Sequence, residues 1–509
     1  MKQLELFEPE HFERLDNLTK DELKQFLKLQ MDLNNRMMAE VRRLKALEHE
    51  LRQRSFLVEE QYITIKNKIY GRSSEKEKSK ERERSNVDKV SKTKVQLPSL
   101  RYPNAPIIER HITLDNPPNC NCCHHQLTDS GMTEDSEYLT VVPAQYLVVR
   151  EKKHKYRCEK CHGDLKTTPA NPRIKPGSSF SDEMMIDVAL SKYCDLIPVE
   201  RYAAMAGREG IKDLPPQSLI ETTHYVSDFL RGVYDLIKKD ILLSKILHAD
   251  ETPHRMLEGH EKSRWYLWGF SNKKSCYFEI HDTRSGDIAS DLLINSECEY
   301  LLSDVFSGYN KAIKDSNIKR MELNRTLILN PNCNAHARRK FKEAKENFDD
   351  EARYFIDEYK AIYKLEDHCK SKTKDEIETI RAQMDTHFKN MKTQAIKNFA
   401  GYSSKSSIGK AMSYFLGNYD GLTLFLKNGD IAIDNNSQER LLRNPVVGRK
   451  TWYGTHSIRG AETAAVLFTL VETCKLNNVN PREYFKKLVE DLHLGKKPYT
   501  PSEFIDLPH

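Results

Sequence analysis

The sequence predicts an α/β protein whose core is a sheet with a helical insertion, preceded by three smaller regions and a charged linker. Three observations predict this class. The first 70 or so residues carry a helical heptad pattern, two Cys-x-x-Cys pairs follow, and short strand-like runs alternate with helical ones after Lys245. With 509 residues the chain is too long for one hydrophobic core, and we expect several domains.

Composition excludes some classes of function. Lys plus Arg number 81 against 75 for Asp plus Glu, and this net charge of +6 permits a nucleic-acid partner without requiring one. Hydrophobic residues make up 38% of the chain, and no uncharged apolar run approaches the ~18 residues of a membrane span. The N-terminus lacks the basic and then apolar pattern of a secretory signal. We therefore expect a soluble, cytoplasmic protein without a membrane partner.

The first region, 1–74, is predicted to be one long helix, spanning about residues 18 to 68. Its apolar residues form a loose heptad seam, which favours a short coiled coil; a helix packed on its own domain is the alternative. One core position of the seam holds Leu23, Met37, Leu44, Leu51 and Val58, and the other holds Leu27 and Val41. Region 75–104 is densely charged with mixed signs, and this composition predicts a solvated linker.

The region 105–175 is predicted to be a zinc ribbon. Two Cys-x-x-Cys pairs flank apolar, strand-like runs at 138–142 and 146–149, and each pair would supply two thiolates to a structural Zn²⁺. Buried or redox cysteines are the alternative. The expected ligands are Cys120, Cys123, Cys158 and Cys161, and the nearby Cys122, His124, His125 and His162 are possible substitutes. Region 176–244 is predicted to be helical, either as a DNA-reading helix-turn-helix or as a packing collar.

After residue 245 the pattern changes to strands. Runs at 246–251, 265–270 and 275–280 predict a three-stranded meander, 287–294 a helix, 300–305 a fourth strand and 325–329 a fifth. Three antiparallel strands followed by alternating helix and strand are typical of a ribonuclease-H-like sheet, in which the first and fourth strands are neighbours. Asp250 and Asp304, which end those two strands, are therefore predicted to lie side by side. Glu251 is left out because successive strand residues face opposite sides.

A third carboxylate is predicted on the helix after Asp434. Asp434 has the position of an N-cap, and Glu439 lies inside the helix and shares a face with Asn435 and Asn436. Because capping already accounts for Asp434, Glu439 is the preferred third ligand. Three carboxylates can hold two hard cations about 3.5–4 Å apart, one beside the attacking oxygen and one beside the leaving oxygen. Oxygen ligands favour two Mg²⁺ or Mn²⁺ ions.

Several motifs together resemble the bacterial insertion-sequence 66 transposases. They are residues 69–76 (IYGRSSEK), 192–198 (KYCDLIP), 248–253 (HADETP), 266–269 (YLWG), 302–309 (LSDVFSGY), 333–341 (CNAHARRKF) and 434–450 (DNNSQERLLRNPVVGRK). The resemblance covers nearly the whole chain. It implies a DDE-type DNA transposase with Asp250, Asp304 and Glu439 as the triad, and a helical insertion at 342–425 that divides the core into 245–341 and 426–509.

The resemblance also extends to the Cys-x-x-His element at Cys333 and His336. In some related transposases this element lies between the second Asp and the Glu, and His336 is a candidate for a position near the scissile phosphate; a buried, hydrogen-bonded histidine is the alternative. Two departures from the family pattern are His124-His125 after the first cysteine pair and Asn334, where tryptophan is common.

Basic side chains near the acids are candidate DNA contacts, because cations neutralise phosphates and make binding depend on salt. Trp452 is a candidate for stacking on an unpaired terminal base, with a role in the core as the alternative. The candidate DNA-binding residues are Arg338, Arg339, Arg440, Arg443, Arg449, Lys450 and Trp452.

The predicted function is metal-assisted hydrolysis of transposon ends followed by joining of the 3′ ends to target DNA. Two rivals stay open: a ribonuclease-H-like nuclease without strand transfer, and a catalytically silent zinc-ribbon DNA-binding regulator. The expected partners are transposon-end and target DNA, further copies of the chain in a homodimer or larger synaptic complex, and accessory proteins of the same element. The expected place of action is the bacterial cytoplasm, at the nucleoid.

Overall fold

The computed structural model describes most of the chain in two compact units. The described residues are 19–70, 97–103, 105–109, 118–119, 121–124, 126–127, 136–140, 145–157, 165–257 and 264–507. The first unit comprises Met1–Gly71, Lys153–Gly207 and Lys212–His509, and the second comprises Arg72–Lys152 and Arg208–Ile211. Within the described ranges, no helix combines the length and apolar character that crossing a membrane requires.

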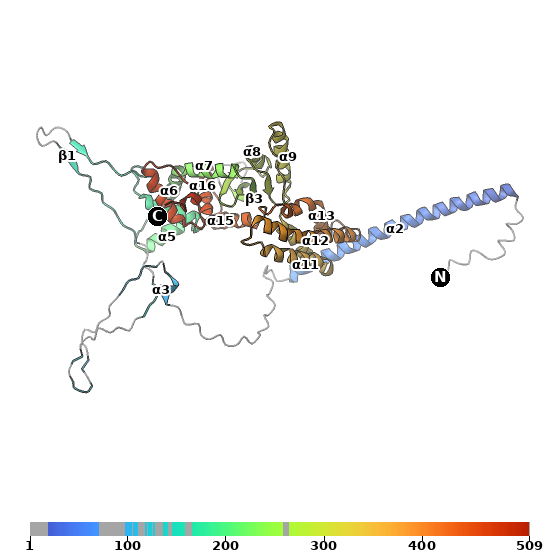
Figure 1. Ribbon diagram of the computed structural model, residues 1–509, viewed down its shortest axis with the longest axis horizontal. Helices are drawn as coiled ribbons and strands as arrows, with labels where there is room; N and C mark the ends of the chain where they lie inside the picture. The colour runs from blue at the N-terminus through green and yellow to red at the C-terminus, as the bar shows by residue number, and fades with distance from the viewer. Residues whose placement is uncertain are drawn as a thin grey trace. The chain divides into compact units, whose positions relative to one another are not determined.

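A four-stranded mixed sheet lies at the centre of the first unit (Figure 1). Its strands are β3 (Ile246–Arg255), β4 (Arg264–Ser271), β5 (Cys276–His281) and β6 (Tyr300–Leu302), in the order β5-β4-β3-β6. The β3–β4 and β4–β5 pairs are antiparallel, and β3 and β6 are parallel with His248 opposite Leu302. The first and fourth strands are thus neighbours, as the sequence predicts.

Helices pack around this sheet and form one core with it. The core includes the fully buried Trp268, Phe270 and Phe278 of the sheet. The helices before the sheet are α4 (Asp182–Tyr193), α5 (Val199–Arg208), α6 (Pro216–Phe229) and α7 (Arg231–Leu242); those between the strands and the insertion are α8 (Asp287–Ile294) and α9 (Ser307–Glu322); and those at the end are α15 (Asn436–Trp452), α16 (Ile458–Leu476), α17 (Pro481–His493) and α18 (Pro501–Phe504).

Helix α16 also covers the edge strand of the sheet. Thr469 Oγ1 accepts from the backbone N–H of Phe278 at 2.9 Å, and Thr473 Oγ1 bonds to both the N–H and the carbonyl of Cys276. An uncovered strand edge is a site for pairing with another chain, so these two threonines satisfy backbone groups of β5 that would otherwise be free. Helix α16 therefore has a specific task in the sheet.

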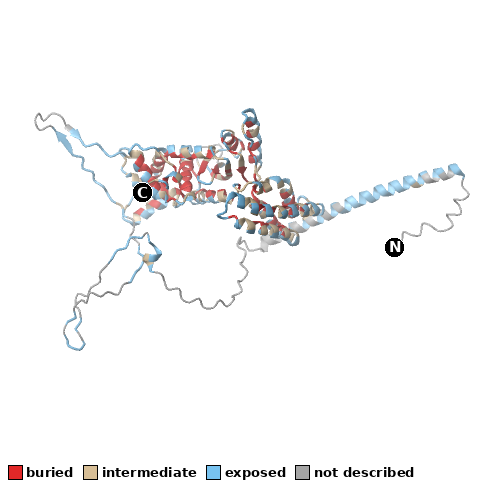
Figure 2. Ribbon diagram, viewed as in Figure 1, coloured by how far each residue is buried: buried red, intermediate tan, exposed pale blue. Residues whose placement is uncertain are grey.

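A helical region with its own core, called the insertion below, follows α9 and begins at Asn334, before the predicted start at residue 342. It consists of α10 (Asn334–Ala344), α11 (Asp349–Asp367), α12 (Lys374–Phe399), α13 (Ser407–Gly417), α14 (Tyr419–Thr423) and the 3₁₀ helix η1 (Leu424–Lys427). Phe341 of α10 stacks on Phe355 of α11 at 4.3 Å between ring centroids, and Phe388 and Phe415 lie in the same cluster. Figure 2 shows buried residues in both this cluster and the sheet region.

The N-terminal helix is α2 (Lys20–Tyr70), one uninterrupted helix as predicted (Figure 1). Its seam residues Met37, Leu44, Leu51 and Val58 are 55–66% exposed. In the second unit, α3 (Pro98–Arg101) is short, and Ser99 donates to Glu137 through both its N–H and its hydroxyl.

Three expectations about local structure were wrong. The described parts of the runs at 138–142 and 146–149 form no strands, and Tyr138 and Val148 are 70% and 97% exposed; apolar alternation makes a strand only where a partner strand is available. The antiparallel pair in this stretch is β1 (Lys155–Arg157) with β2 (Leu165–Thr167).

The fifth strand is reduced to isolated parallel bridges, Tyr300 with Leu329 and Ser303 with Asn332. The N-cap of α15 is Asn435, one residue after Asp434.

Candidate active site

The two aspartates follow the parallel pairing of β3 and β6 at equivalent positions, Asp250 within β3 and Asp304 just after β6. His248 of β3 pairs with Leu302 of β6, and Asp250 and Asp304 each follow these residues by two positions. Each carboxylate is oriented by a nearby backbone group: the N–H of Glu251 donates to Asp250 Oδ1 at 2.9 Å, and the N–H of Phe306 donates to Asp304 Oδ1 at 3.2 Å. The sheet therefore brings together two acids that are far apart in the sequence.

The electrostatics of Asp250 show how closely the acids gather. The pKa of Asp250 is raised to about 8, mainly by removal from water, then by the charges of Glu251 and Asp304 and, more weakly, of Glu439, against a backbone hydrogen bond that lowers it. Like charges in a poorly solvated site disfavour a further ionised carboxylate. Such a cluster is costly unless protons or cations neutralise it, and it is typical of functional sites.

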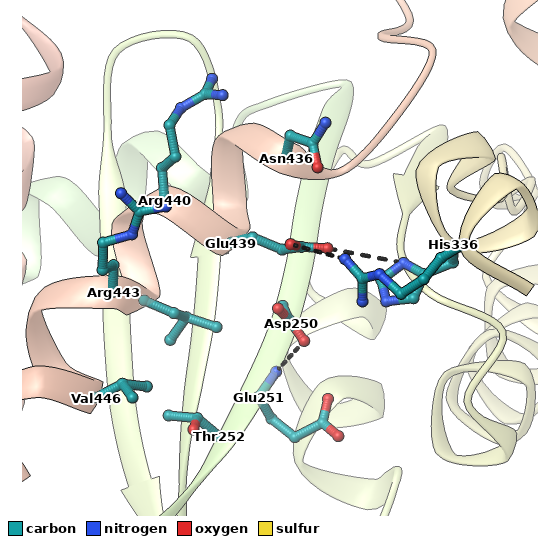
Figure 3. Close-up of a pocket in the computed structure, with 11 residues that line it drawn as sticks. Asp250, Glu251, Thr252, His336, Asn436, Glu439, Arg440, Arg443 and Val446 are labelled. Carbon is teal, nitrogen blue, oxygen red and sulfur yellow. Dashed lines mark hydrogen bonds and ion pairs between the residues drawn. The ribbon is translucent and has the colours of Figure 1, made fainter. Parts of the chain in front are cut away.

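Glu439 reaches the same site from the first turn of α15. With Asp250, Asn436, Arg440 and Arg443 it lines an open pocket of ≈ 580 Å³ (Figure 3). Its Oε1 lies 3.8 Å from His336 Nδ1 and its Oε2 lies 3.7 Å from the Arg339 guanidinium, both on α10. The pocket thus collects side chains from β3, from the insertion and from α15.

Asn435 anchors the start of α15 to β3. Its Nδ2 donates to the Ala249 carbonyl at 2.8 Å, and its Oδ1 lies 3.0 Å from His248 Nδ1. Its backbone N–H also donates to Cys333 Sγ at 3.2 Å. The sequence predicts that Asn435 and Asn436 share the helix face of Glu439. In the structure the side chain of Asn435 contacts β3 instead, and of the two asparagines only Asn436 lines the pocket. The chain segment 248–249 beside Asp250 is therefore held directly by the helix that carries Glu439.

Asp434 has other partners. Its Oδ2 accepts from the Tyr363 hydroxyl at 2.8 Å and from Asn436 Nδ2, and its Oδ1 accepts from the Asn436 N–H at 3.1 Å. It thereby satisfies a free N–H of the first turn of α15 and ties this turn to α11. Asp434 does not line the pocket, and this geometry supports the preference for Glu439.

Glu251 contributes to the wall of the pocket, with its carboxylate already engaged. Its side chain is only 2% exposed; Oε1 accepts from Arg284 Nε at 2.7 Å and Oε2 accepts from the Tyr309 hydroxyl at 2.6 Å. Sequence reasoning missed Arg284 and Tyr309, because nothing in their local patterns links them to Glu251. Both oxygens of Glu251 are thus engaged, although this acid lines the pocket and its charge raises the pKa of Asp250.

The candidate DNA-binding residues divide into two groups. Arg339, Arg440 and Arg443 are exposed and line the pocket, and Lys450 is exposed on the same helix as the last two. Arg338 of α10 lies over the ring of Tyr363 of α11, 5.4 Å from its centroid, and does not line the pocket. The positive charge at the pocket therefore comes from three arginines.

Arg449 and Trp452 make contacts inside the fold. Arg449 donates to the Pro253 carbonyl of β3, and Trp452 stacks on Phe468 of α16 and meets Tyr193 of α4 edge-on. The Lys192 ammonium lies 4.2 Å from the Trp452 ring. These contacts account for both side chains as packing residues, and we leave them out of the pocket's DNA surface.

The donor set at the pocket suits a hard divalent cation. Glu439 Oε1 is shielded from solvent and accepts no hydrogen bond among the described residues, and the charges of Asp304 and Glu439 both raise the pKa of Asp250. Carboxylate oxygens are ligands that Mg²⁺ and Mn²⁺ prefer. Of the expected zinc ligands, Cys120, Cys158 and Cys161 lie outside the described residues, and Cys123 is exposed.

Comparison with known proteins identifies the family. The family model described as Transposase IS66 family matches residues 177–463, more than half of the chain. The chain belongs to the IS66 transposase family. Uncharacterized protein y4hP of Sinorhizobium fredii (strain NBRC 101917 / NGR234) is 25% identical to this IS66-family chain over 76% of the chain and 72% of its own length. Uncharacterized protein y4jD of the same strain is 26% identical over 74% and 75%.

IS66 membership confirms the resemblance drawn from the motifs. It supports a transposase role and implies a DNA partner and the use of a divalent metal. The matched region contains Asp250, Asp304, Glu439 and His336, so the IS66 family match and the pocket cover the same part of the fold.

Proposed function

We propose that this IS66-family chain is a DDE-type transposase that hydrolyses the phosphodiester at transposon ends and then joins the freed 3′ ends to target DNA. The observation that carries the proposal is that Asp250 and Glu439 line one pocket, while Asp304 follows the neighbouring parallel strand and raises the pKa of Asp250 through its charge without lining the pocket itself. The strand order β5-β4-β3-β6, with a parallel pair at β3 and β6, supports a ribonuclease-H-like core.

The proposed roles follow from the contacts of each side chain. Asp250, Asp304 and Glu439 would hold two Mg²⁺ or Mn²⁺ ions, which when bound lower the barrier by charge stabilisation on the attacking and leaving oxygens. Arg339, Arg440 and Arg443 would bind the DNA phosphates at the pocket rim. His336, beside Glu439, would contact the scissile phosphate. Cys120, Cys123, Cys158 and Cys161, of which only Cys123 is among the described residues, would hold a structural zinc.

A cleavage and joining assay tests the proposal. It uses DNA that carries the element's own ends, Mg²⁺ or Mn²⁺, the element's accessory proteins, and the full chain. We expect 3′-end cleavage and joined products. Cleavage without joined products would favour the nuclease, and end binding without metal-dependent strand breakage would favour the silent regulator.

Neutralising the arginines of α15 is expected to weaken DNA binding. Arg440 and Arg443 are exposed and line the pocket, so the double variant Arg440→Ala/Arg443→Ala removes two phosphate contacts. We expect roughly tenfold weaker binding at moderate salt, and a plot of log affinity against log salt that is shallower by about 2. Fluorescence anisotropy over a salt series measures both.

The matched control for this pair is Arg482→Ala. Arg482 is an exposed arginine of α17 that pairs with Asp187 and does not line the pocket. Its substitution should leave the salt slope unchanged. Equal slopes for the double variant and the wild type would remove Arg440 and Arg443 from the proposed DNA surface.

We propose that α2 joins two copies of the chain through its apolar seam. The exposed Met37, Leu44, Leu51 and Val58 recur at seven-residue intervals, which is the pattern of a coiled-coil seam. Leu44→Asp is expected to weaken self-association at least about tenfold, because it places a charge in the buried seam. Ala46→Asp, on the outer face of the same helix, is the control. Analytical ultracentrifugation measures both, and equal association of the two variants would argue against the seam.

A further inference from the structure

Three residues beside the pocket form a second ligand cluster of different chemistry. Cys333 is the N-cap of α10, His336 lies in the first turn of that helix, and Glu439 faces them from α15. One ligand atom from each, Sγ, an imidazole nitrogen and a carboxylate oxygen, lies within 4.8 Å of the other two. The Cys-x-x-His spacing across the start of a helix places the thiol and the imidazole on one side.

Two polar atoms of this cluster are buried without a hydrogen bond among the described residues. His336 Nδ1 and Glu439 Oε1 are both shielded from solvent, 3.8 Å apart, and neither makes a hydrogen bond. Buried polar atoms are normally hydrogen-bonded, and two facing atoms without a bond need an explanation. Cys333 Sγ, by contrast, accepts the backbone N–H of Asn435, which fixes the sulfur at the edge of the cluster.

We propose that Cys333, His336 and Glu439 bind a transition metal of the zinc class, and that this metal inhibits DNA cleavage by taking Glu439 from the catalytic carboxylates. The inhibitory half rests on the proposed function. Sulfur, nitrogen and oxygen ligands together suit Zn²⁺ at about 2.0–2.3 Å, whereas Mg²⁺ does not accept a thiolate. The ligand atoms would have to approach one another by about 1 Å, which side-chain rotation of His336 and Glu439 can supply.

Competition follows from the position of Glu439. Its carboxylate points toward His336 in Figure 3, while Asp250 lies on the strand beside it. An ion held by Cys333 and His336 would draw the carboxylate toward α10. The same side chain would then have less negative charge to offer to ions held by Asp250 and Asp304. Whether the Glu439 carboxylate binds with Cys333 and His336 or with the catalytic aspartates would thus depend on which class of metal is present.

Metal binding by the full chain tests the site without any DNA. Co²⁺ serves as the probe, because its bonds to thiolate give a strong near-ultraviolet absorption, and the titration is run at pH 8 since a bound metal must displace the thiol proton. We expect Cys333→Ser to bind one equivalent fewer than the wild type, with a proportionate loss of the thiolate band. Cys369→Ser, a buried cysteine of the insertion that lies outside the cluster, should match the wild type.

A second variant guards against misfolding. The His336 side chain is 28% exposed, so His336→Gln should fold and should also lose one equivalent. If Cys333→Ser and His336→Gln both bind as many equivalents as the wild type, the site does not exist.

Cleavage under zinc tests the inhibitory half. With Mg²⁺ fixed, the zinc concentration that halves cleavage should rise at least tenfold in Cys333→Ser relative to the wild type. Equal half-inhibitory concentrations would overturn the inhibition even if the metal binds. If the wild type fails to cleave with Mg²⁺ alone, the proposed function fails, and the Co²⁺ titration still decides the metal site.

Discussion

Replacing Asp250, Asp304 or Glu439 by its amide is expected to abolish end cleavage, with a fall of at least ~10³-fold, while DNA binding stays within a few-fold of the wild type. Each amide keeps the shape of the side chain and removes its negative charge. The arginines at the rim are unchanged in these variants, so the phosphates still have their partners. Gel-based cleavage of end DNA and anisotropy with the same DNA measure the two effects.

Asp434→Asn is the matched control for Glu439→Gln. Asp434 lies beside the same helix start, but its oxygens are held by Tyr363 and Asn436, and it does not line the pocket. Cleavage by this variant should stay within about tenfold of the wild type. Normal cleavage by Glu439→Gln together with loss of cleavage in Asp434→Asn would transfer the third-ligand role to Asp434.

Asp250→Asn is expected to stabilise the metal-free protein above pH 8. The native pKa of Asp250 is about 8, raised by removal from water and by neighbouring acids, whereas in the unfolded chain the carboxyl titrates near its ordinary value. Between those two values the native state holds a proton that the unfolded state releases. The free energy of unfolding therefore falls as pH rises from about 4 to 8 and stays lower above that. Asparagine removes this penalty, which is on the order of a few kcal/mol.

Urea unfolding in the presence of a chelator, at several pH values between 4 and 9, measures this effect. The advantage of Asp250→Asn over the wild type should grow with pH, and saturating Mg²⁺ should reduce it because the ion binds the native acid cluster. Asp430→Asn is a control that should lower the free energy of unfolding instead of raising it, because Lys273 and Lys374 stabilise the charged form of Asp430 and lower its pKa. If Asp250→Asn were no more stable than the wild type at pH 9, the acids would not be crowded as described.

Much of the fold around the site was accessible from local patterns. The strands of the meander, the helix at 287–294 and the neighbouring positions of Asp250 and Asp304 follow from alternation and chain order, and the structure contains them. The errors arise where a pattern needs a distant partner. The apolar runs near Tyr138 and Val148 alternate like strands, yet without a pairing strand in the described chain they stay extended and exposed.

The site shows the same division. Residue types and motif positions single out the acids and the arginines as candidates, and of these Asp250, Glu439, Arg339, Arg440 and Arg443 line one pocket in the structure. The bond from Asn435 to the Ala249 carbonyl, and the contacts of Arg449 with Pro253 and of Trp452 with Phe468, join segments far apart in sequence. Only the folded chain specifies such pairs, and for this reason sequence reasoning could not separate the packing residues from those that face the pocket.

The anchoring of α15 through Asn435 bears on when the protein becomes competent during its synthesis. Asp250 and Asp304 emerge from the ribosome first, and the whole insertion must follow before Asn435 can reach the Ala249 carbonyl and Glu439 can reach the pocket. A nascent chain, or one ended early by a stop codon within the insertion, therefore carries two of the three acids and no helix to complete them. If the chain has the proposed activity, DNA close to the site of translation meets the complete set of acids only after Glu439 has been made.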